Sequence, residues 1–465
     1  MSDLVEVRAG VYHDSVSLMR VSQAVTARPG VTVAVVAMAT ELNIGLARDL
    51  GFDVPAATPG DLLIAVRAGS PGELEEAAAE VERQLAATGA APGPADRETP
   101  PRTTRSAARS WDATLALVSV PGEHAFAEAM DAVAAGLSVM VFSDNVPVEQ
   151  EILLKDLARD NGVLVMGPDC GTAVVAGAGL GFANVLRPGP VGVVAASGTG
   201  AQQITSLLDL AGVGVSHVLG VGGRDLSAEV GGRSTVQALR ALDADPATEL
   251  IVLVSKPPAP GPARAVRELA LSTPVVTALL GPGEDDLTAA AEKVLTALGR
   301  SVPRWPSWPA PGPAAPEPEA TSEALPLRGL YSGGTLCAEA ALIARSAGCA
   351  AGVFTDFGDD EYTRGRAHPM IDPALRLEAL AAVGRGVVLL DVVLGHGADA
   401  DPATGLGPAV ARAVTRGVRV VVALVGTEGD PQGLRDQAAR LNAAGAAVFA
   451  SNAAAARHAV DLCSG

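Results

Sequence analysis

The chain of 465 residues carries a net charge of −18 at neutral pH, and 3% of its residues are aromatic. This length exceeds what one hydrophobic core supports, so about two to four domains are expected. No basic stripe offsets the negative charge, which argues against a nucleic-acid partner. No apolar run reaches the roughly 20 residues of a membrane span, and the first residues lack a secretory pattern. We therefore expect a cytoplasmic protein with no membrane partner.

Two proline-rich segments divide the chain. Residues 86–110 are polar and are expected to form a flexible insertion, whereas residues 302–326 have the composition of an extended linker. The expected plan has a first domain at 1–188, a second at 189–300, a linker at 301–324 and a third domain at 325–465.

Short apolar runs alternate with helical patterns, which predicts an α/β fold of three Rossmann- or flavodoxin-like domains with parallel sheets. In the first domain, strands are expected at 31–38, 62–66, 115–120, 139–142 and 163–166. Ligands of such sheets lie beyond the carboxyl ends of the strands, where the chain has turns rich in Gly, Pro and Asp. The turn residues expected to line the cleft are Gly167, Asp169, Cys170, Arg224 and Asp225.

An apolar run, a Ser/Gly/Thr turn and a helical pattern occur together twice, at residues 191–203 and 327–339. Equal distances separate Ser197 from Gly222 and Gly333 from Gly358, so two similar domains are expected. Free backbone N–H groups at a helix start attract anions, and each turn is therefore a candidate anion cradle. The expected phosphate-binding residues are Ser197, Gly198 and Thr199 in the first cradle, and Gly333, Gly334 and Thr335 in the second.

Charged residues near these turns are candidate catalytic groups. Lys256, one of three lysines, follows an apolar run and is either a fixed charge for phosphate or a surface lysine. A polar cluster in the third domain is either a substrate site or a solvated loop. We assign catalysis to Lys256, Arg364, Arg366 and His368, and place Asp359, Asp360, Asp372 and Asp391 in the cleft.

The sequence assigns no metal ligand set. Asp356, Asp359 and Asp360 are the carboxylates that could hold Mg²⁺, and Asp391 could bind a cation or orient a partner. The four cysteines form no C-x-x-C pair, so buried free thiols are expected and a zinc site is not.

The turns resemble, in order, those of the succinyl-CoA synthetase α subunit: Ser-Val-Pro-Gly (119–122), Asp-Asn-Val-Pro (144–147), Gly-Pro-Asp-Cys (167–170), Ser-Gly-Thr (197–199) and Gly-Gly-Arg-Asp (222–225). The third domain resembles the carboxy-terminal domain of that enzyme's β subunit. FdrA proteins fuse these parts, and the chain is similar to them at residues 12–19, 142–145, 166–172, 221–226, 254–258 and 368–373. The resemblance covers nearly everything outside the two proline-rich segments.

Two departures from the synthetase bear on chemistry. The loop that carries its phosphorylated histidine corresponds to Gly-Pro-Gly-Glu-Asp-Asp (281–286), which has no histidine, and Ser255 and Lys256 replace an expected carboxylate. The glycines of the CoA turn are replaced by His-Asp-Ser-Val-Ser (13–17). The resemblance therefore predicts no phosphohistidine and at best weak CoA binding, with no cofactor assigned and CoA and Mg²⁺ left open.

The resemblance to FdrA proteins implies a subunit of an oxamate carbamoyltransferase, which converts oxalurate and phosphate into oxamate and carbamoyl phosphate in allantoin breakdown. Its partners would be small anions (phosphate, carbamoyl phosphate, a small carboxylate) and other pathway subunits in a hetero-complex. Helix N-termini and cationic side chains would stabilise the developing oxyanion. The alternatives are an acyl-CoA synthetase of the succinate–CoA ligase type and a non-catalytic subunit. In each case the two cradles should face one another.

Overall fold

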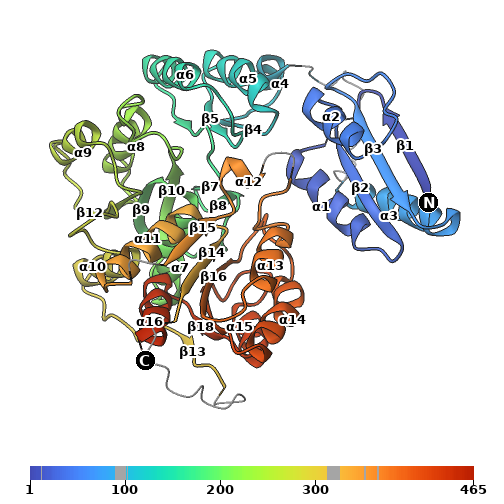
Figure 1. Ribbon diagram of the computed structural model, residues 1–465. Coiled ribbons are helices and arrows are strands. Elements are labelled where there is room, and N and C mark those ends of the chain that lie inside the picture. The colour runs from blue at the N-terminus through green and yellow to red at the C-terminus, as the bar shows by residue number, and fades with distance from the viewer. Residues whose placement is uncertain are drawn as a thin grey trace.

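The computed structural model of the chain describes residues 1–11, 13–88, 101, 103–311, 325–349, 352–363 and 366–464. These residues form four β-sheets with helices packed around them (Figure 1). Arg364 and most of the two proline-rich segments lie outside the described residues. No helix in the described ranges is long and apolar enough to cross a membrane.

The N-terminal module is an antiparallel sheet in the order β1-β3-β2, set apart from the other sheets in Figure 1. Its elements are β1 (Ser2–Arg8), α1 (Ser15–Thr26), β2 (Val31–Met38), α2 (Glu41–Asp49), β3 (Leu62–Ala68) and α3 (Pro71–Thr88). The predicted parallel pairing of β2 and β3 is wrong. On β3, Ile64 packs towards α1 and α3, whereas Leu63 and Ala65 pack towards α2. Burial on both faces produces the continuous apolar run that is typical of parallel strands.

The remaining strands of the expected first domain form a small parallel sheet, β4-β5-β6. Its elements are α4 (Thr104–Ser110), β4 (Leu115–Val118), α5 (Gly122–Ala134), β5 (Ser138–Val141), α6 (Val148–Asp160) and β6 (Val165–Met166). Helix α4 lies in the predicted flexible insertion and begins with a capping box between Thr103 and Ser106. Residues 1–188 thus contain two separate sheets and part of a third.

The second expected domain is a six-stranded sheet in the order β12-β11-β9-β10-β7-β8. Its elements are β7 (Thr172–Val175), β8 (Ala178–Gly181), β9 (Pro188–Ala196), α7 (Gly198–Leu210), β10 (Val215–Gly220), α8 (Arg233–Asp243), β11 (Leu250–Ser255), α9 (Pro260–Arg267), β12 (Val275–Ala278) and α10 (Leu287–Ala297). The strands from β9 to β12 are parallel, and the β7–β8 hairpin adds an antiparallel edge. The domain therefore begins before residue 189.

The third domain is a six-stranded sheet in the order β13-β18-β17-β16-β14-β15, parallel except for β13. Its elements are β13 (Ser307–Trp308), β14 (Leu327–Tyr331), α11 (Gly334–Ser346), β15 (Val353–Asp356), α12 (Asp360–Thr363), α13 (Ala374–Ala381), β16 (Val387–Val393), α14 (Pro402–Thr415), β17 (Arg419–Val425), α15 (Leu434–Ala443), β18 (Ala447–Phe449) and α16 (Asn452–Ser464). Two contacts hold the start of the linker against the folded domains. Strand β13 joins this sheet, and Trp305 Nε1 donates to Glu292 Oε1 at 2.8 Å.

The second and third domains share one hydrophobic core, which joins residues of α7, α10, α11 and α16 (Figure 1). Buried hydrogen bonds cross the same interface, since Asn452 N donates to Gln203 Oε1 at 2.8 Å and Leu287 N donates to Glu339 Oε1 at 2.6 Å. The two domains are therefore held as one body, and the predicted α/β class with mostly parallel sheets is confirmed.

Candidate functional site at the junction of the second and third domains

The two cradles meet directly at this junction. Ser197 caps α7, where its Oγ accepts from Gly200 N at 2.9 Å, and it donates to Thr335 Oγ1 at 2.6 Å. A Cβ added to Gly333 would lie 2.8 Å from Thr199 Oγ1, so the absence of a side chain lets the two turns approach. The helix starts predicted from the repeated pattern are thus brought face to face.

The second cradle is organised by a buried carboxylate. Asp391, in β16, is completely buried and accepts hydrogen bonds from Ser332 N at 2.7 Å, Ser332 Oγ at 3.0 Å and Gly333 N at 2.8 Å. Arg376 Nη1 pairs with the same carboxylate at 2.6 Å. The Gly333 amide is therefore already used, and the N–H groups that α11 offers to a ligand are those of its first turn, from Gly334 onward.

Gly334, the first residue of α11, is half-buried, so the second cradle is accessible to solvent at this position. A Cβ there would overlap Asp356 Oδ2 and lie 2.7 Å from Lys256 Nζ. Lys256 follows β11 and is exposed, so the second domain places a cation over the N-terminus of the third domain's helix. Burial raises the pKa of Asp356 to about 6, while Gly358 N, which donates to Oδ1 at 2.9 Å, and Lys256 act to lower it.

His368 lies beside this group rather than in solvent. Its Nδ1 accepts from Met370 N at 3.2 Å, and its ring centre lies 5.6 Å from that of Phe182 in the second domain. Burial, with a smaller effect of Arg376, lowers the pKa of His368 to about 4. The imidazole is therefore neutral near pH 7 and contributes no positive charge towards a substrate anion.

The other residues of the predicted polar cluster are more dispersed. Arg366 is exposed and lines a shallow depression together with Asp372. Asp359 is exposed and accepts from Glu361 N at 3.2 Å. Asp360 begins α12, and its side chain, like all of Arg364, lies outside the described residues. Of these predicted residues, His368 therefore lies next to the cradles, whereas Arg366 does not.

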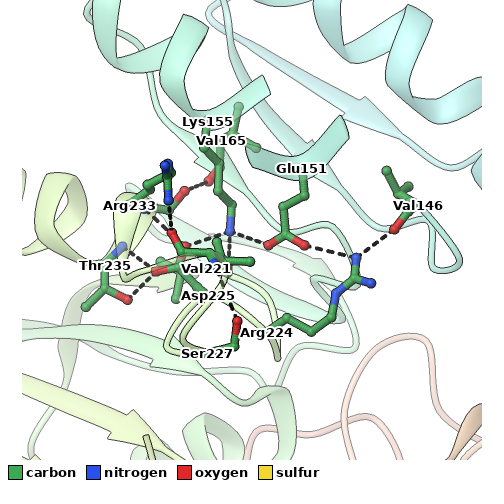
Figure 2. A network of polar contacts seen from close by, with 12 residues as sticks. Val146, Glu151, Lys155, Val165, Val221, Arg224, Asp225, Ser227, Arg233 and Thr235 are labelled. Atoms are coloured by element: carbon green, nitrogen blue, oxygen red, sulfur yellow. Dashed lines mark hydrogen bonds and ion pairs between the residues drawn. The ribbon is translucent and has the colours of Figure 1, made fainter. Parts of the chain in front are cut away.

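Asp225 belongs to a buried ion network, and the exposed Arg224 pairs with it from the edge (Figure 2). Lys155 Nζ contacts Glu151 Oε1 and Asp225 Oδ1, each at 2.7 Å, and all three side chains are buried. Asp225 also accepts from Thr235 N at 2.8 Å, and Arg224 pairs with Glu151 at 2.9 Å. Asp225 is therefore unavailable to a substrate, because its oxygens fix α6 to the turn before α8.

Of the remaining predicted cleft residues, Gly167 and Cys170 are buried, whereas Asp169 is exposed. A Cβ at Gly167, which has a φ of +96°, would overlap Val141 O, so this turn requires glycine. Cys170 is buried, and burial raises its pKa to about 12, so it is a protonated thiol near pH 7. Asp169 N donates to Ser143 O at 2.9 Å, which ties two strand-end turns together.

The sequence did not identify Arg376 and Glu339 as site residues. Arg376 lies in the ordinary amphipathic pattern of α13, and with Ser332 and Asp399 it lines a small pocket of about 20 Å³. Glu339 is buried in α11, where burial raises its pKa to about 7. The one sequence signal for Arg376 and Glu339 is a charged side chain on a buried helix face. That signal can be recognised only when it is known which face of the helix is buried. Among the described residues, no group of His, Cys, Asp and Glu side chains is arranged to hold a metal ion.

Two mostly parallel α/β domains meet at helix N-termini, and residues 330–462 match the CoA-ligase family model. Residues 1–101 match the model of the AllF heavy metal-associated domain. The YahF protein of Escherichia coli (strain K12) is 36% identical to the chain over 97% of each protein. The chain therefore belongs to the family of YahF.

Other proteins match shorter parts of the chain. The succinate–CoA ligase α subunit 2 of Archaeoglobus fulgidus is 31% identical over 33% of the chain, which spans about half (53%) of that subunit. The malate–CoA ligase α subunit of Methylorubrum extorquens is 26% identical over 35% of the chain and 56% of its own length. A structure of ATP citrate lyase from Methanothrix soehngenii aligns with 44% of the chain and 38% of its own chain, at 19% identity and a TM-score of 0.32.

These comparisons correct the expected activity. The matched CoA-ligase model and succinate–CoA ligase subunits are acid–thiol ligases, so the carbamoyltransferase class predicted from the resemblance is wrong and its acyl-CoA synthetase alternative is better supported.

The name of the N-terminal family model implies a heavy metal, but the residues do not fit one. Residues 1–101 contain one histidine and no cysteine, so they lack the thiolates that soft metal ions prefer.

Proposed function

We propose that the chain performs the acyl-transfer step of an acyl-CoA synthetase, in which an acyl phosphate and the thiol of CoA exchange to give an acyl-CoA and phosphate. The observation that carries the proposal is the junction of the two cradles, where Ser197 bonds to Thr335 and Lys256 lies beside Gly334. Its small anionic substrates would be the acyl phosphate and phosphate. A cytoplasmic location and a hetero-complex with partner subunits remain predictions.

The first cradle suits the phosphate. Gly198 and Thr199 are partly exposed at the start of α7, and their amides belong to the first helical turn, which has no acceptors within the helix. Lys256 would add a point charge to the phosphate as the carbon–oxygen bond breaks. The dipole of α11, whose first turn opens at Gly334, would stabilise negative charge on the acyl carbonyl oxygen.

Asp356 suits the role of proton acceptor. A carboxylate with a pKa of about 6 is mostly ionised near pH 7.5 and is a stronger base than an ordinary aspartate. As the thiol sulfur bonds to the acyl carbon, its proton would pass to Asp356, and phosphate would leave with the electrons of the broken bond. The absence of histidine from residues 281–286 fits a reaction that begins from an acyl phosphate instead of a phosphorylated enzyme.

The proposal is tested by incubating the purified chain with CoA and acetyl phosphate, and measuring the thioester by chromatography. We expect Gly334→Val to abolish its formation, because the side chain would displace Asp356 and Lys256. Gly261→Val is the matched control, since Gly261 also lies in the first turn of a helix but a Cβ added there would meet nothing within 4 Å. Equal loss in both variants, or thioester formation that Gly334→Val leaves unchanged, would refute the assignment.

A further inference from the structure

Two of the four cysteines lie together at the far end of the third domain, away from the cradles. Cys349 follows the C-terminus of α11, and Cys463 lies in the last turn of α16. The two helices pack against each other, Cys349 packs against the core that includes Cys463, and the neighbouring Cys349 thiol adds to the effect of burial in raising the pKa of Cys463.

The two thiols differ in access. Cys349 is partly exposed, whereas Cys463 is 4% exposed and its Sγ donates to Ala459 O at 3.2 Å. A partly exposed thiol next to a buried one is the arrangement in which an oxidant reaches one sulfur and the second sulfur resolves the product. Cys170 and Cys337 are both buried, and each is separated from this pair in the fold.

We infer that Cys349 and Cys463 form a redox modification site, in which a hydroperoxide or a small disulfide converts the two thiols into an intramolecular disulfide. With hydrogen peroxide, the Cys349 sulfur attacks one oxygen to give a sulfenic acid and water. The Cys463 sulfur then attacks the sulfenic sulfur, loses its proton and expels hydroxide, which leaves as water. Two thiols and one peroxide thus give one disulfide and two waters.

The disulfide would fix the C-terminal helix to the loop after α11. Cys463 O already accepts from Leu325 N at 3.1 Å, so the same bond would secure the point where the third domain begins. The disulfide would close a loop from Cys349 to Cys463, which is most of the domain. It should therefore strongly restrict the conformations of the unfolded chain. We expect oxidation to raise the thermal unfolding midpoint by several degrees, and dithiothreitol to reverse the change.

The test treats the full chain with hydrogen peroxide or oxidised glutathione, and maps its peptides by mass spectrometry without reduction. We expect a peptide pair linked through Cys349 and Cys463 within the monomer, while Cys170 and Cys337 stay reduced as internal controls. Cys349→Ser should abolish the link, and Cys463→Ala should leave Cys349 as a mixed disulfide with glutathione. A wild-type chain in which Cys349 is modified alone, links two chains, or reacts no faster than Cys170 would overturn the inference.

Discussion

Asp391→Ala should destabilise the third domain more than any loss of a surface ion pair. The carboxylate is completely buried and contacts Ser332 N, Gly333 N and Arg376 Nη1 at 2.6–2.8 Å. Its removal leaves two backbone donors without their acceptor and a buried guanidinium without its counter-charge. The second cradle would then lose the group that fixes its shape.

The magnitude follows from these contacts. Removing one partner of a buried ion pair costs about 3–5 kcal/mol, and each buried donor left unsatisfied costs about 1–3 kcal/mol. The effects overlap, so we expect a loss of about 3–5 kcal/mol. The control is Glu428→Ala: Glu428 pairs with Arg435 at 2.7 Å, but the two side chains are 47% and 75% exposed. That pair should contribute at most about 1 kcal/mol.

Urea unfolding followed by tryptophan fluorescence is a suitable assay, since Trp308 packs on the core of the third domain. For a domain of this size, the expected loss corresponds to a midpoint lowered by about 1–2 M urea. Asp391→Ala combined with Arg376→Met should recover part of the loss, because no buried charge is then left unpaired. An Asp391→Ala midpoint that matches that of Glu428→Ala would refute the view that this carboxylate organises the cradle.

Three further predictions concern charge. Burial raises the pKa of Asp356 to about 6, above its ordinary value of 3.8, so the folded chain binds a proton more tightly than the unfolded chain and loses stability as pH rises from about 4 to 6. At about pH 8, Asp356→Asn should therefore unfold at a higher urea concentration than wild type, and this difference should vanish below about pH 4. A difference that is constant with pH would contradict this. Lys155→Met should lower the unfolding midpoint by an amount equivalent to about 3–5 kcal/mol, because it leaves Asp225 without its buried counter-charge and leaves Glu151 with Arg224 alone. Wild-type stability of this variant would show that the network in Figure 2 does not stabilise the fold. Lys256→Ala should weaken phosphate binding in calorimetry by roughly 1.5–3 kcal/mol, whereas Lys293→Ala, an exposed lysine paired with Asp285, should leave it unchanged.

The parts of the fold that the sequence predicted are those with a local pattern. The repeated run, turn and helix at Ser197 and Gly333 required only short-range periodicity, and the structure places both turns at helix starts. Strand direction is not local: β2 and β3 are largely apolar because helices cover both faces of an antiparallel sheet. The same composition fits a parallel sheet, so pairing could not be deduced from it.

The candidate site was predictable where glycine or a strand end marked it, as at Gly334 and Lys256. It was not predictable where a charge acts inside the fold. Asp391 and Asp225 both follow the rule that an acidic residue near a strand end indicates a ligand site, yet their partners are internal donors. Those partners come from residues distant in the chain, such as Arg376 for Asp391 and Lys155 for Asp225, and packing alone brings them together.

We propose that the junction of the two cradles transfers an acyl group from phosphate to a thiol. The purified chain can be incubated with CoA and isotopically labelled acetyl phosphate, and both acetyl-CoA and released phosphate followed over time. We expect the two products to appear in equal amounts, and Lys256→Ala to slow both while Lys293→Ala slows neither. Phosphate release without thioester, or the same rate in both lysine variants, would contradict it.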